Sequence, residues 1–214
     1  ADEALIADPV VTIAGQLATI SGTGPYTATY TMQSSDSNAT LSYTVDFTDV
    51  SGNTGTQVTA TTDSSLVVFD KTNPTITTLT IASNNADTAK AKVGDVVTLS
   101  ITADEALIAD PVVTIAGQSA TISGAGPYTA TYTMQSSDSN ATLSYTVDFT
   151  DASGNTGTQV TATTDSSLVI FDKTLPTLSI VTIESSNADT TRAQVGDVIT
   201  LSITADEALI ANPA

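Results

Sequence analysis

An internal repeat of 102 residues constrains the fold of this chain more than any other feature of its sequence. The segment ADEALIADPVVTIAGQ at residues 1–16 recurs unchanged at 103–118, and ADEALIANPA closes the chain at 205–214. Aligning residues 1–102 with 103–204 gives 87 identical positions and 15 differences. Self-similarity at one fixed period indicates a tandem array of one structural unit. Because the chain begins and ends inside a repeat, we expect both ends to be cut points in a longer polypeptide.

Alternation of apolar and polar residues predicts β-strands throughout the repeat. Val97, Leu99 and Ile101, for example, are separated by Thr98 and Ser100. A period of two is that of a half-buried strand, and no segment shows a convincing helical stripe. Turn signals divide one repeat into seven expected strands, A to G, at residues 75–82, 96–103, 111–116, 119–123, 127–134, 142–149 and 156–171, the last with a bulge at 165–167.

Seven short alternating strands in one repeat are the pattern of an antiparallel immunoglobulin-like β-sandwich. The predicted fold class is therefore all-β, with Greek-key sandwiches of about seven strands joined end to end. We expect a partial repeat at residues 1–73 (strands C to G), a complete repeat at 74–173, and a partial repeat at 174–214 (strands A and B).

Composition excludes several classes of function. With 23 Asp and Glu against 5 Lys and Arg, the net charge is −18, which argues against binding nucleic acid. The absence of His and Cys excludes an imidazole base, a thiolate nucleophile and the usual zinc and haem sites. No apolar run has the roughly 20 residues of a membrane span. We therefore expect no enzyme, and no membrane span in this segment.

Three motifs carry a resemblance to a known family. They are Val-Gly-Asp-Val before strand B, Tyr-Thr-Val-Asp-Phe-Thr-Asp-x-Ser-Gly-Asn-Thr-Gly at the F–G turn, and Phe-Asp-Lys-Thr-x-Pro at the repeat boundary. Together they resemble the bacterial Ig-like repeats of large cell-surface adhesins and biofilm proteins. The resemblance implies an extracellular, cell-surface setting, often with calcium at domain boundaries.

Sandwich topology predicts that several acidic loops meet. Because successive strands alternate in direction, the linker between repeats arrives at the B–C and F–G loops of the next repeat. The candidate ligands there are Asp70, Asp104, Glu105, Asp148, Asp151 and Asn155, then Asp172, Asp206 and Glu207 at the following junction, with first-repeat copies Asp2, Glu3, Asp46, Asp49 and Asn53. Carboxylate and amide oxygens are Ca²⁺ ligands. We expect bound Ca²⁺ to fix the angle between neighbouring domains.

Two alternatives to this calcium hypothesis stay open at the level of sequence. Asp, Ser, Gly and Asn also form ordinary turns, and acidic surface charge keeps proteins soluble. A second acidic cluster is expected at the opposite end of the repeat from Asp36, Asn38, Asp87 and Asp95. Lys71 and Lys173 either pair with the acidic junction or form an isopeptide crosslink, the latter disfavoured by their exposure in the linker.

These observations favour a structural role. We expect the repeats to be extender or stalk units of an extracellular adhesin-like protein, whose partners are the neighbouring repeats of the same polypeptide. The rival hypothesis is a subunit of an extracellular filament or sheath, assembled laterally from other copies or by strand complementation between chains. A carbohydrate- or ice-binding module is a less favoured alternative: the alternating Thr residues of strand E suggest an ice-binding surface, but they are also what any solvent-exposed strand contains, and few aromatic residues are present for carbohydrate binding.

Overall fold

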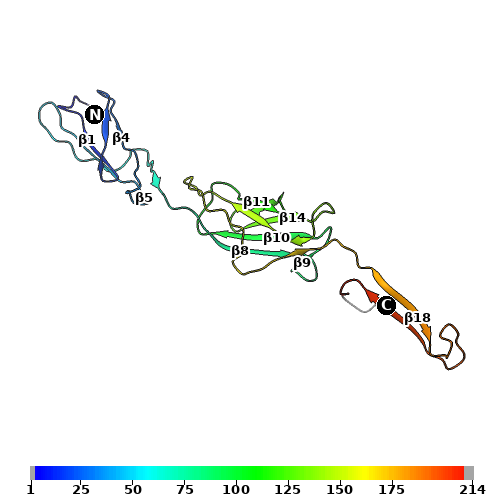
Figure 1. Cartoon of the computed structure of the whole chain (residues 1–214). Helices are drawn as coiled ribbons and strands as arrows, with labels where there is room; N and C mark the ends of the chain where they lie inside the picture. Colours follow the sequence, from blue (N-terminus) through cyan, green and yellow to red (C-terminus); the bar gives the residue numbers. More distant parts are fainter. Residues whose placement is uncertain (1–2, 210–214) are drawn as a thin grey trace. The chain divides into compact units, whose positions relative to one another are not determined.

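A computed structural model describes residues 3–209 of the chain (Figure 1). The regular elements in these residues are all β-strands, which confirms the all-β prediction. Most strand pairs are antiparallel. Because the described part of the chain contains no helix, it has no helical segment that could cross a membrane.

The chain divides into two compact units. One comprises the described residues up to Thr80 together with Leu99–Thr131 and Ser144–Ser166. The other comprises Ile81–Thr98, Tyr132–Leu143 and the described residues from Ser167 onward. The expected complete repeat at 74–173 contributes to both units, and the predicted boundaries after residues 73 and 173 stay predictions.

The described residues of the first partial repeat form seven short strands in three small sheets. Their orders are β2-β1-β6, β3-β4 and β5-β7. The strands are β1 (Val10–Ile13), β2 (Gln16–Leu17), β3 (Thr19–Ser21), β4 (Thr27–Thr29), β5 (Ala39–Thr40), β6 (Tyr43–Asp46) and β7 (Val68–Phe69).

The complete repeat has ten strands in three sheets, ordered β13-β14-β10-β8, β12-β11-β16 and β15-β17-β9. The strands are β8 (Ile76–Ser83), β9 (Lys90–Ala91), β10 (Val96–Ala103), β11 (Val112–Ile115), β12 (Gln118–Ser119), β13 (Thr121–Gly124), β14 (Tyr128–Thr133), β15 (Ala141–Thr142), β16 (Tyr145–Asp148) and β17 (Ile170–Phe171). The pair β17–β9 is parallel. The last partial repeat adds one antiparallel hairpin, β18 (Leu178–Ser185) and β19 (Ile199–Ala205).

A tight turn explains how β11 reverses into β12. Ala116 and Gly117 have φ values of 53° and 75°, and Ile115 pairs with Gln118 across them. Two consecutive positive φ angles are those of a type I′ turn, whose twist matches that of a two-residue hairpin. The strand expected at 119–123 is consequently divided, because β12 pairs with β11 whereas β13 pairs with β14.

The strand expected at 156–171 is not continuous. Thr156 and Val160 form isolated bridges to Thr150 and Val147, and only β17 is a regular strand in this segment. Ser166 has φ 63°, a left-handed conformation that interrupts a strand at the predicted bulge. The backbone of this segment therefore changes partners instead of following one neighbour along its whole length.

The core of the complete repeat follows from the alternation in its strands. In β10 the side chains of Val97, Leu99 and Ile101 are all buried, as predicted. Ile115 of β11 and Val147 of β16, which belong to a second sheet, are fully buried as well. Burial of each such side chain contributes roughly 1.5–3 kcal/mol. Inward residues from two sheets give the repeat a sandwich-like core.

Candidate metal centre

Three carboxylates converge where the linker after β7 meets loops of the complete repeat. Asp70 directly follows β7, Glu105 lies two residues after β10, and Asp151 lies three residues after β16. One carboxylate oxygen from each lies within 4.8 Å of the others. Asp151 is fully buried, and the other two are half-buried. The structure thus brings together residues that are separated by more than 30 positions in the sequence.

Asp151 owes its position to the turn that it caps. Its Oδ1 accepts hydrogen bonds from the backbone N–H groups of Ser153 and Asn155, both at 2.8 Å, and its Oδ2 accepts one from Asn155 Nδ2 at 2.8 Å. Burial raises the pKa of Asp151, but the hydrogen bonds from the Asn155 side chain and the turn backbone outweigh it, so the pKa is lowered. Asp151 is therefore a fixed carboxylate held in its charged form.

Asp70 is held by the chain on either side of the linker. Its Oδ1 accepts hydrogen bonds from Asn38 Nδ2 at 2.6 Å and from the backbone N–H of Thr72 at 2.9 Å. Asn155 Nδ2 also donates to the backbone carbonyl of Asp70 at 3.3 Å. Among the described residues no bond to Oδ2 is found, so this oxygen is available as a ligand.

Glu105 is the least satisfied member of the cluster. Within residues 3–209 its carboxylate accepts no hydrogen bond and forms no ion pair. Burial raises its pKa, and the negative charges of Asp151, Asp70 and Asp104 raise it further, in that order. Like charges gathered at one site repel each other unless a cation neutralises them.

No lysine or arginine of the described chain supplies that neutralisation. Lys71 Nζ instead donates to the backbone carbonyls of Ser34 at 2.7 Å and Asp36 at 2.6 Å. Lys173 makes the corresponding bonds to the carbonyls of Ser136 and Asp138. The ion pairs found in residues 3–209 are Lys90–Asp87 and Arg192–Asp189, neither of which touches the cluster. The hypothesis that Lys71 pairs with the acidic junction is therefore wrong.

Two predicted ligands face other partners. Asp104 accepts hydrogen bonds from the backbone N–H and the hydroxyl of Thr75, both at 2.8 Å. These bonds, the backbone one first, lower the pKa of Asp104. Asp148 accepts from Gln159 Nε2 at 2.8 and 3.0 Å. Of the six residues predicted at this junction, Asp70, Glu105, Asp151 and Asn155 come together.

The second junction repeats part of this arrangement. Asp172 accepts from Asn140 Nδ2 and the Thr174 N–H, both at 2.9 Å, as Asp70 does from its own Asn and Thr. Asp206 is held by the N–H and hydroxyl of Thr177. A cavity of about 480 Å³ is lined by Asp172, Asp206 and Glu207 among others, and one of about 490 Å³ by Asp70, Asp104 and Glu105.

In the first repeat, the counterparts of the predicted ligands form the same hydrogen-bonded turn but not the cluster of three carboxylates. Asp49 accepts hydrogen bonds from the N–H of Ser51 and from the N–H and Nδ2 of Asn53, at 2.7–2.8 Å. Asp46 accepts from Gln57, and Glu3 is exposed. Asp2 lies outside the described residues. No acidic group of three around Asp49 is found in the described chain.

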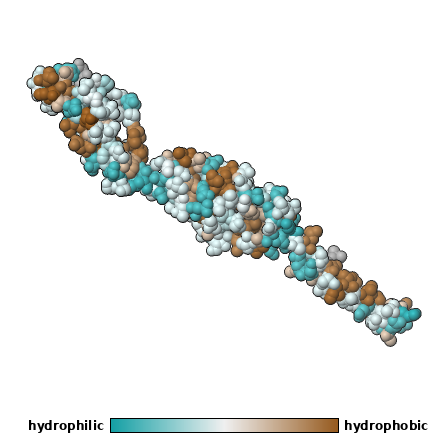
Figure 2. Space-filling model, turned by 45° about the horizontal axis from the view of Figure 1, so that its top comes forward, coloured by the Kyte–Doolittle hydropathy of each residue, from teal (hydrophilic) through white to brown (hydrophobic). Residues whose placement is uncertain are grey.

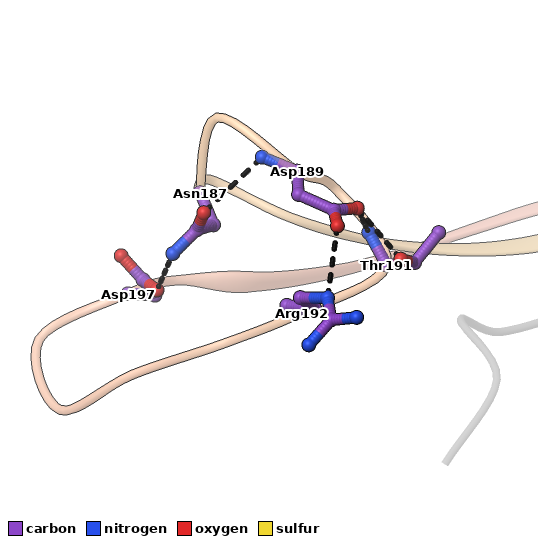
Figure 3. Close-up of polar contacts among 5 residues, drawn as sticks. All are labelled: Asn187, Asp189, Thr191, Arg192 and Asp197. Carbon is purple, nitrogen blue, oxygen red and sulfur yellow. Dashed lines mark hydrogen bonds and ion pairs between the residues drawn. The ribbon is translucent and has the colours of Figure 1, made fainter.

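The predicted second acidic cluster consists of residues with local hydrogen-bond partners. Asp36 accepts from the Tyr30 hydroxyl and the Gln33 N–H, Asp87 from the Ala89 N–H, and Asp95 from Asn85 Nδ2 and the Lys92 N–H. Figure 3 shows the same network in the last repeat, where Asn187 bonds Asp197 at 3.0 Å and Arg192 bonds Asp189 at 3.0 Å. These contacts are those of turn formation.

Asn38 has a role at the junction that sequence reasoning missed. It was expected in the second cluster, but its Nδ2 donates to Asp70 and its Oδ1 accepts from the Lys71 N–H at 3.0 Å. Asn140 makes the same two contacts with Asp172 and Lys173. The two contacts recur because the repeats are near-identical, and no signal in the sequence singles out this Asn–Asp pair.

The donor set fits a hard divalent cation. It offers carboxylate oxygens from three residues, one of them without any hydrogen bond, on a framework fixed by turns and clamps. Ca²⁺ is bound by carboxylates, amide oxygens, backbone carbonyls and water, whereas Zn²⁺, Cu²⁺ and iron sites usually include nitrogen or sulfur ligands.

Comparisons with known proteins identify no family for this chain. No family model matches the chain, and no curated protein matches it. A solved structure that is similar is described as the Bacteroides ovatus mixed-linkage glucan utilization locus SGBP-B in complex with a mixed-linkage heptasaccharide. The match has 15% identity and a TM-score of 0.25, and it covers 83% of this chain and 42% of that one. Similarity at this level carries no argument about fold or ligand.

Proposed function

We propose that the chain is a run of extender repeats from a long extracellular, cell-surface protein of the adhesin type, stiffened by Ca²⁺ at its junctions. The observation that carries this proposal is the cluster of Asp70, Glu105 and Asp151. Asp70 comes from the linker, while the other two come from loops of the following repeat. An ion bound by all three ties the linker to that repeat.

The sheet orders support immunoglobulin-like repeats. In expected strand letters, the order β13-β14-β10-β8 is D-E-B-A, and β11-β16 with the bridge from Val160 is C-F-G. This division into an ABED sheet and a CFG sheet is that of the constant-type immunoglobulin sandwich. Near-identical copies of such a unit make a protein longer, because each copy extends the chain of domains by the same distance.

The mechanism requires only this chain's own residues and one kind of ion. Asp151 and Asn155 form a preset turn, and the Asn38 clamp holds Asp70 against its own repeat. When bound, Ca²⁺ supplies the positive charge that offsets the mutual repulsion of the carboxylates. The linker then loses its freedom to move away from the loops, and a flexible string of domains becomes a stiff rod.

Small-angle scattering of the whole chain, titrated with Ca²⁺ and then with chelator, tests this function. We expect Ca²⁺ to increase the maximum dimension and to raise the melting temperature, and chelator to reverse both changes. Glu105→Gln should abolish the response without disturbing the turn, because the Glu105 side chain makes no hydrogen bond in the described chain. Glu3→Gln, at the exposed first-repeat copy, is the matched control and should respond like the unmodified chain.

Two results would contradict the proposal in distinguishable ways. If Ca²⁺ raises the melting temperature without changing the dimensions, the ion binds but does not stiffen the chain. If neither quantity changes, the acidic loops are turns and solubilising charge, and the ion-binding hypothesis is wrong.

A further inference from the structure

The stretch of chain that enters the complete repeat bonds to the stretch that leaves it. β8 is the edge strand of its sheet, with β10 as its neighbour. The backbone N–H of Thr164 donates to the carbonyl of Leu79 in β8 at 2.8 Å. In return, the N–H of Leu79 donates to the Thr164 hydroxyl at 3.1 Å, and the N–H of Ile81 donates to the Ser167 hydroxyl at 2.9 Å. The segment before β17 thus covers the open edge of β8, using hydroxyls where a regular strand uses carbonyls.

A parallel strand pair continues this contact. β17 pairs with β9, which follows β8 in the chain. The backbone N–H of Ile170 donates to the carbonyl of Ala89 at 2.8 Å, and that of Asp172 donates to the carbonyl of Ala91 at 2.9 Å. The partners on the entering side therefore advance along the chain together with those on the leaving side, so the two sides are parallel throughout.

We call the contact between residues 79–91 and residues 164–172 the terminal seam. Its entering side follows the linker from the preceding repeat, and its leaving side runs into the linker to the next one. Because the two sides are parallel, tension between the linkers pulls them in opposite directions along the seam. Bonds in this geometry are stretched together, whereas bonds that are pulled apart from one end break one after another. Opening the seam by tension therefore requires several bonds to fail at once.

Buried apolar side chains keep water away from the seam. Leu79, Val169 and Phe171 are 0% exposed, and Ile81 and Ala91 are 3% exposed. In Figure 2 white and teal residues cover most of the visible surface of the complete repeat, in the middle of the view. A hydrogen bond that is excluded from water is electrostatically stronger than an exposed one. Water is also kept from replacing a bond of the seam while the core stays closed.

Side-chain contacts anchor both ends of the seam. Where the chain enters the repeat, the N–H and the hydroxyl of Thr75 donate to the Asp104 carboxylate, both at 2.8 Å. Where the chain leaves, the backbone N–H of Lys173 donates to Asn140 Oδ1 at 3.0 Å, and Lys173 Nζ donates to the carbonyl of Ser136 at 2.9 Å. These contacts hold the chain beside the seam at the two places where tension arrives.

We propose that the terminal seam is a load-bearing clamp, by which each complete repeat resists tension along the chain. Thr164 and Ser167 are its specific residues, because their hydroxyls accept the N–H groups of Leu79 and Ile81. This function rests on the proposed role as an extender, since a stalk that is fixed at both ends carries tension. It involves no metal ion and none of the three carboxylates of the candidate metal centre.

Pulling the full chain from two pairs of points tests the clamp. The chain has no Cys, so introduced Cys residues provide the handles. Asn73→Cys with Leu175→Cys places handles in the linkers on either side of the repeat and shears the seam. Asn73→Cys with Ser153→Cys places both handles at the entering end, because Ser153 follows Asp151, whose carboxylate lies near that of Asp70. This second pair unzips the seam from one end.

Unfolding rates at one constant force, measured with magnetic tweezers in chelator, compare the two pulls. Forced unfolding reports the unfolding barrier, and the shear pair should unfold at least about tenfold more slowly than the unzipping pair. Unfolding of the repeat between residues 73 and 175 is recognised by its extended length of roughly 340–370 Å, at about 3.3–3.6 Å per residue. Equal rates with the two pairs of handles would overturn the proposal.

Removing the two hydroxyls tests whether the resistance lies in the seam. Thr164→Val with Ser167→Ala should raise the unfolding rate of the shear pair at least about tenfold at the same force, and that of the unzipping pair by about twofold or less. Thr114→Val removes a cross-strand hydroxyl bond on β11, outside the seam, and is the matched control. It should leave both rates within about twofold of the original. A shear rate that the double substitution leaves unchanged, or rates raised equally for both pairs of handles, would contradict the clamp.

The clamp and the ion site are tested independently. Chelator is present in every pulling experiment, so the rates do not depend on Ca²⁺ binding. Conversely, Thr164→Val with Ser167→Ala leaves the three carboxylates in place, so this variant should show the same Ca²⁺ response in scattering as the unmodified chain. Failure of the clamp therefore leaves the calcium proposal standing, and failure of the calcium proposal leaves the clamp standing.

Discussion

Residues 24–49 and 126–151 have the same sequence and different structures. In the complete repeat Val147 is fully buried and β14 has six residues, while in the first partial repeat Val45 is half-exposed and β4 has three. The difference is the presence of β8 and β10 beside the second copy. Strand length and burial are therefore set by the tertiary partner, in keeping with the strong context dependence of β-propensity.

The acidic turns at Asp49 and Asp151 allow the same comparison between the first partial repeat and the complete repeat, here at the candidate site. Asp49 and Asp151 accept the same three hydrogen bonds from the following Ser and Asn. Only Asp151 has Asp70 and Glu105 beside it among the described residues. The turn is thus common to both repeats, and what distinguishes a candidate ion site is the arrival of the linker.

The largest effect is expected from truncating matched core residues. Ile115→Ala should lower the free energy of unfolding of the complete repeat by about 2–5 kcal/mol, because it leaves a cavity in a closed core. Ile13→Ala, in an identical sequence but half-exposed, should cost markedly less. Region-resolved hydrogen exchange in increasing urea measures both. Equal losses at the two positions would contradict the claim that β8 and β10 close the core.

A smaller effect is expected from Gly157→Ala. A Cβ at this position meets the ring of Phe149, which is buried, so overpacking should cost about 1–3 kcal/mol. Gly55 faces Phe47 in the same way, but that ring is only half-buried and has room to move. Gly55→Ala should therefore be tolerated better. Thermal melts of both variants, assigned by hydrogen exchange, check this order.

The pH dependence provides a third test, away from the candidate metal site. The Asn85 side chain, and next the Lys92 N–H, lower the pKa of Asp95. A lowered pKa stabilises the fold above the ordinary Asp value, and this contribution is lost as the pH falls towards the lowered value. Asp95→Asn should thus lower the melting temperature at neutral pH and flatten its decline in acid.

Asp197 is the matched position for this test. The Asn187 side chain and the Gln194 N–H lower its pKa in the same way. Because its hairpin is not packed into a closed repeat, Asp197→Asn should leave the main melting transition unchanged at every pH. A main transition shifted equally by Asp95→Asn and Asp197→Asn would contradict this expectation.

The smallest effect is expected from removing a cross-strand Thr–Thr hydrogen bond, and its cost should be the same in both repeats. Thr114 and Thr146 share a hydroxyl hydrogen bond of 2.7 Å across β11 and β16, and Thr12 and Thr44 share an identical one. Cross-strand pairs of this kind contribute roughly 0.2–1 kcal/mol. Thr114→Val and Thr12→Val should therefore cost about the same, as measured by urea denaturation. A large difference would mean that β8 and β10 also affect this outer face.

Much of the fold could be predicted from alternation and turn residues. The expected strand at 96–103 matches β10, and the inward faces of Val97, Leu99 and Ile101 are as predicted. The expected strand at 156–171 was wrong because its backbone bonds successively to β16, to Leu79 and to β15. Sequence periodicity does not report a change of hydrogen-bonding partner.

The candidate site was predictable as a neighbourhood but not as a set of ligands. Asp104 and Glu105 are adjacent in the sequence, yet Asp104 is satisfied by Thr75 whereas Glu105 joins Asp70 and Asp151. Both residues lie in the bend that follows β10, and which of the two side chains faces the linker depends on tertiary packing. The same packing brings Asn38 to Asp70, a contact that no local pattern indicates.

Ca²⁺ binding measured by isothermal titration calorimetry tests the central claim most directly. The unmodified chain should bind Ca²⁺, Glu105→Gln should weaken that binding at least tenfold, and Glu3→Gln should leave it unchanged. Absence of binding in the unmodified chain, or equal binding by all three proteins, would contradict the assignment of Asp70, Glu105 and Asp151 as the ion site.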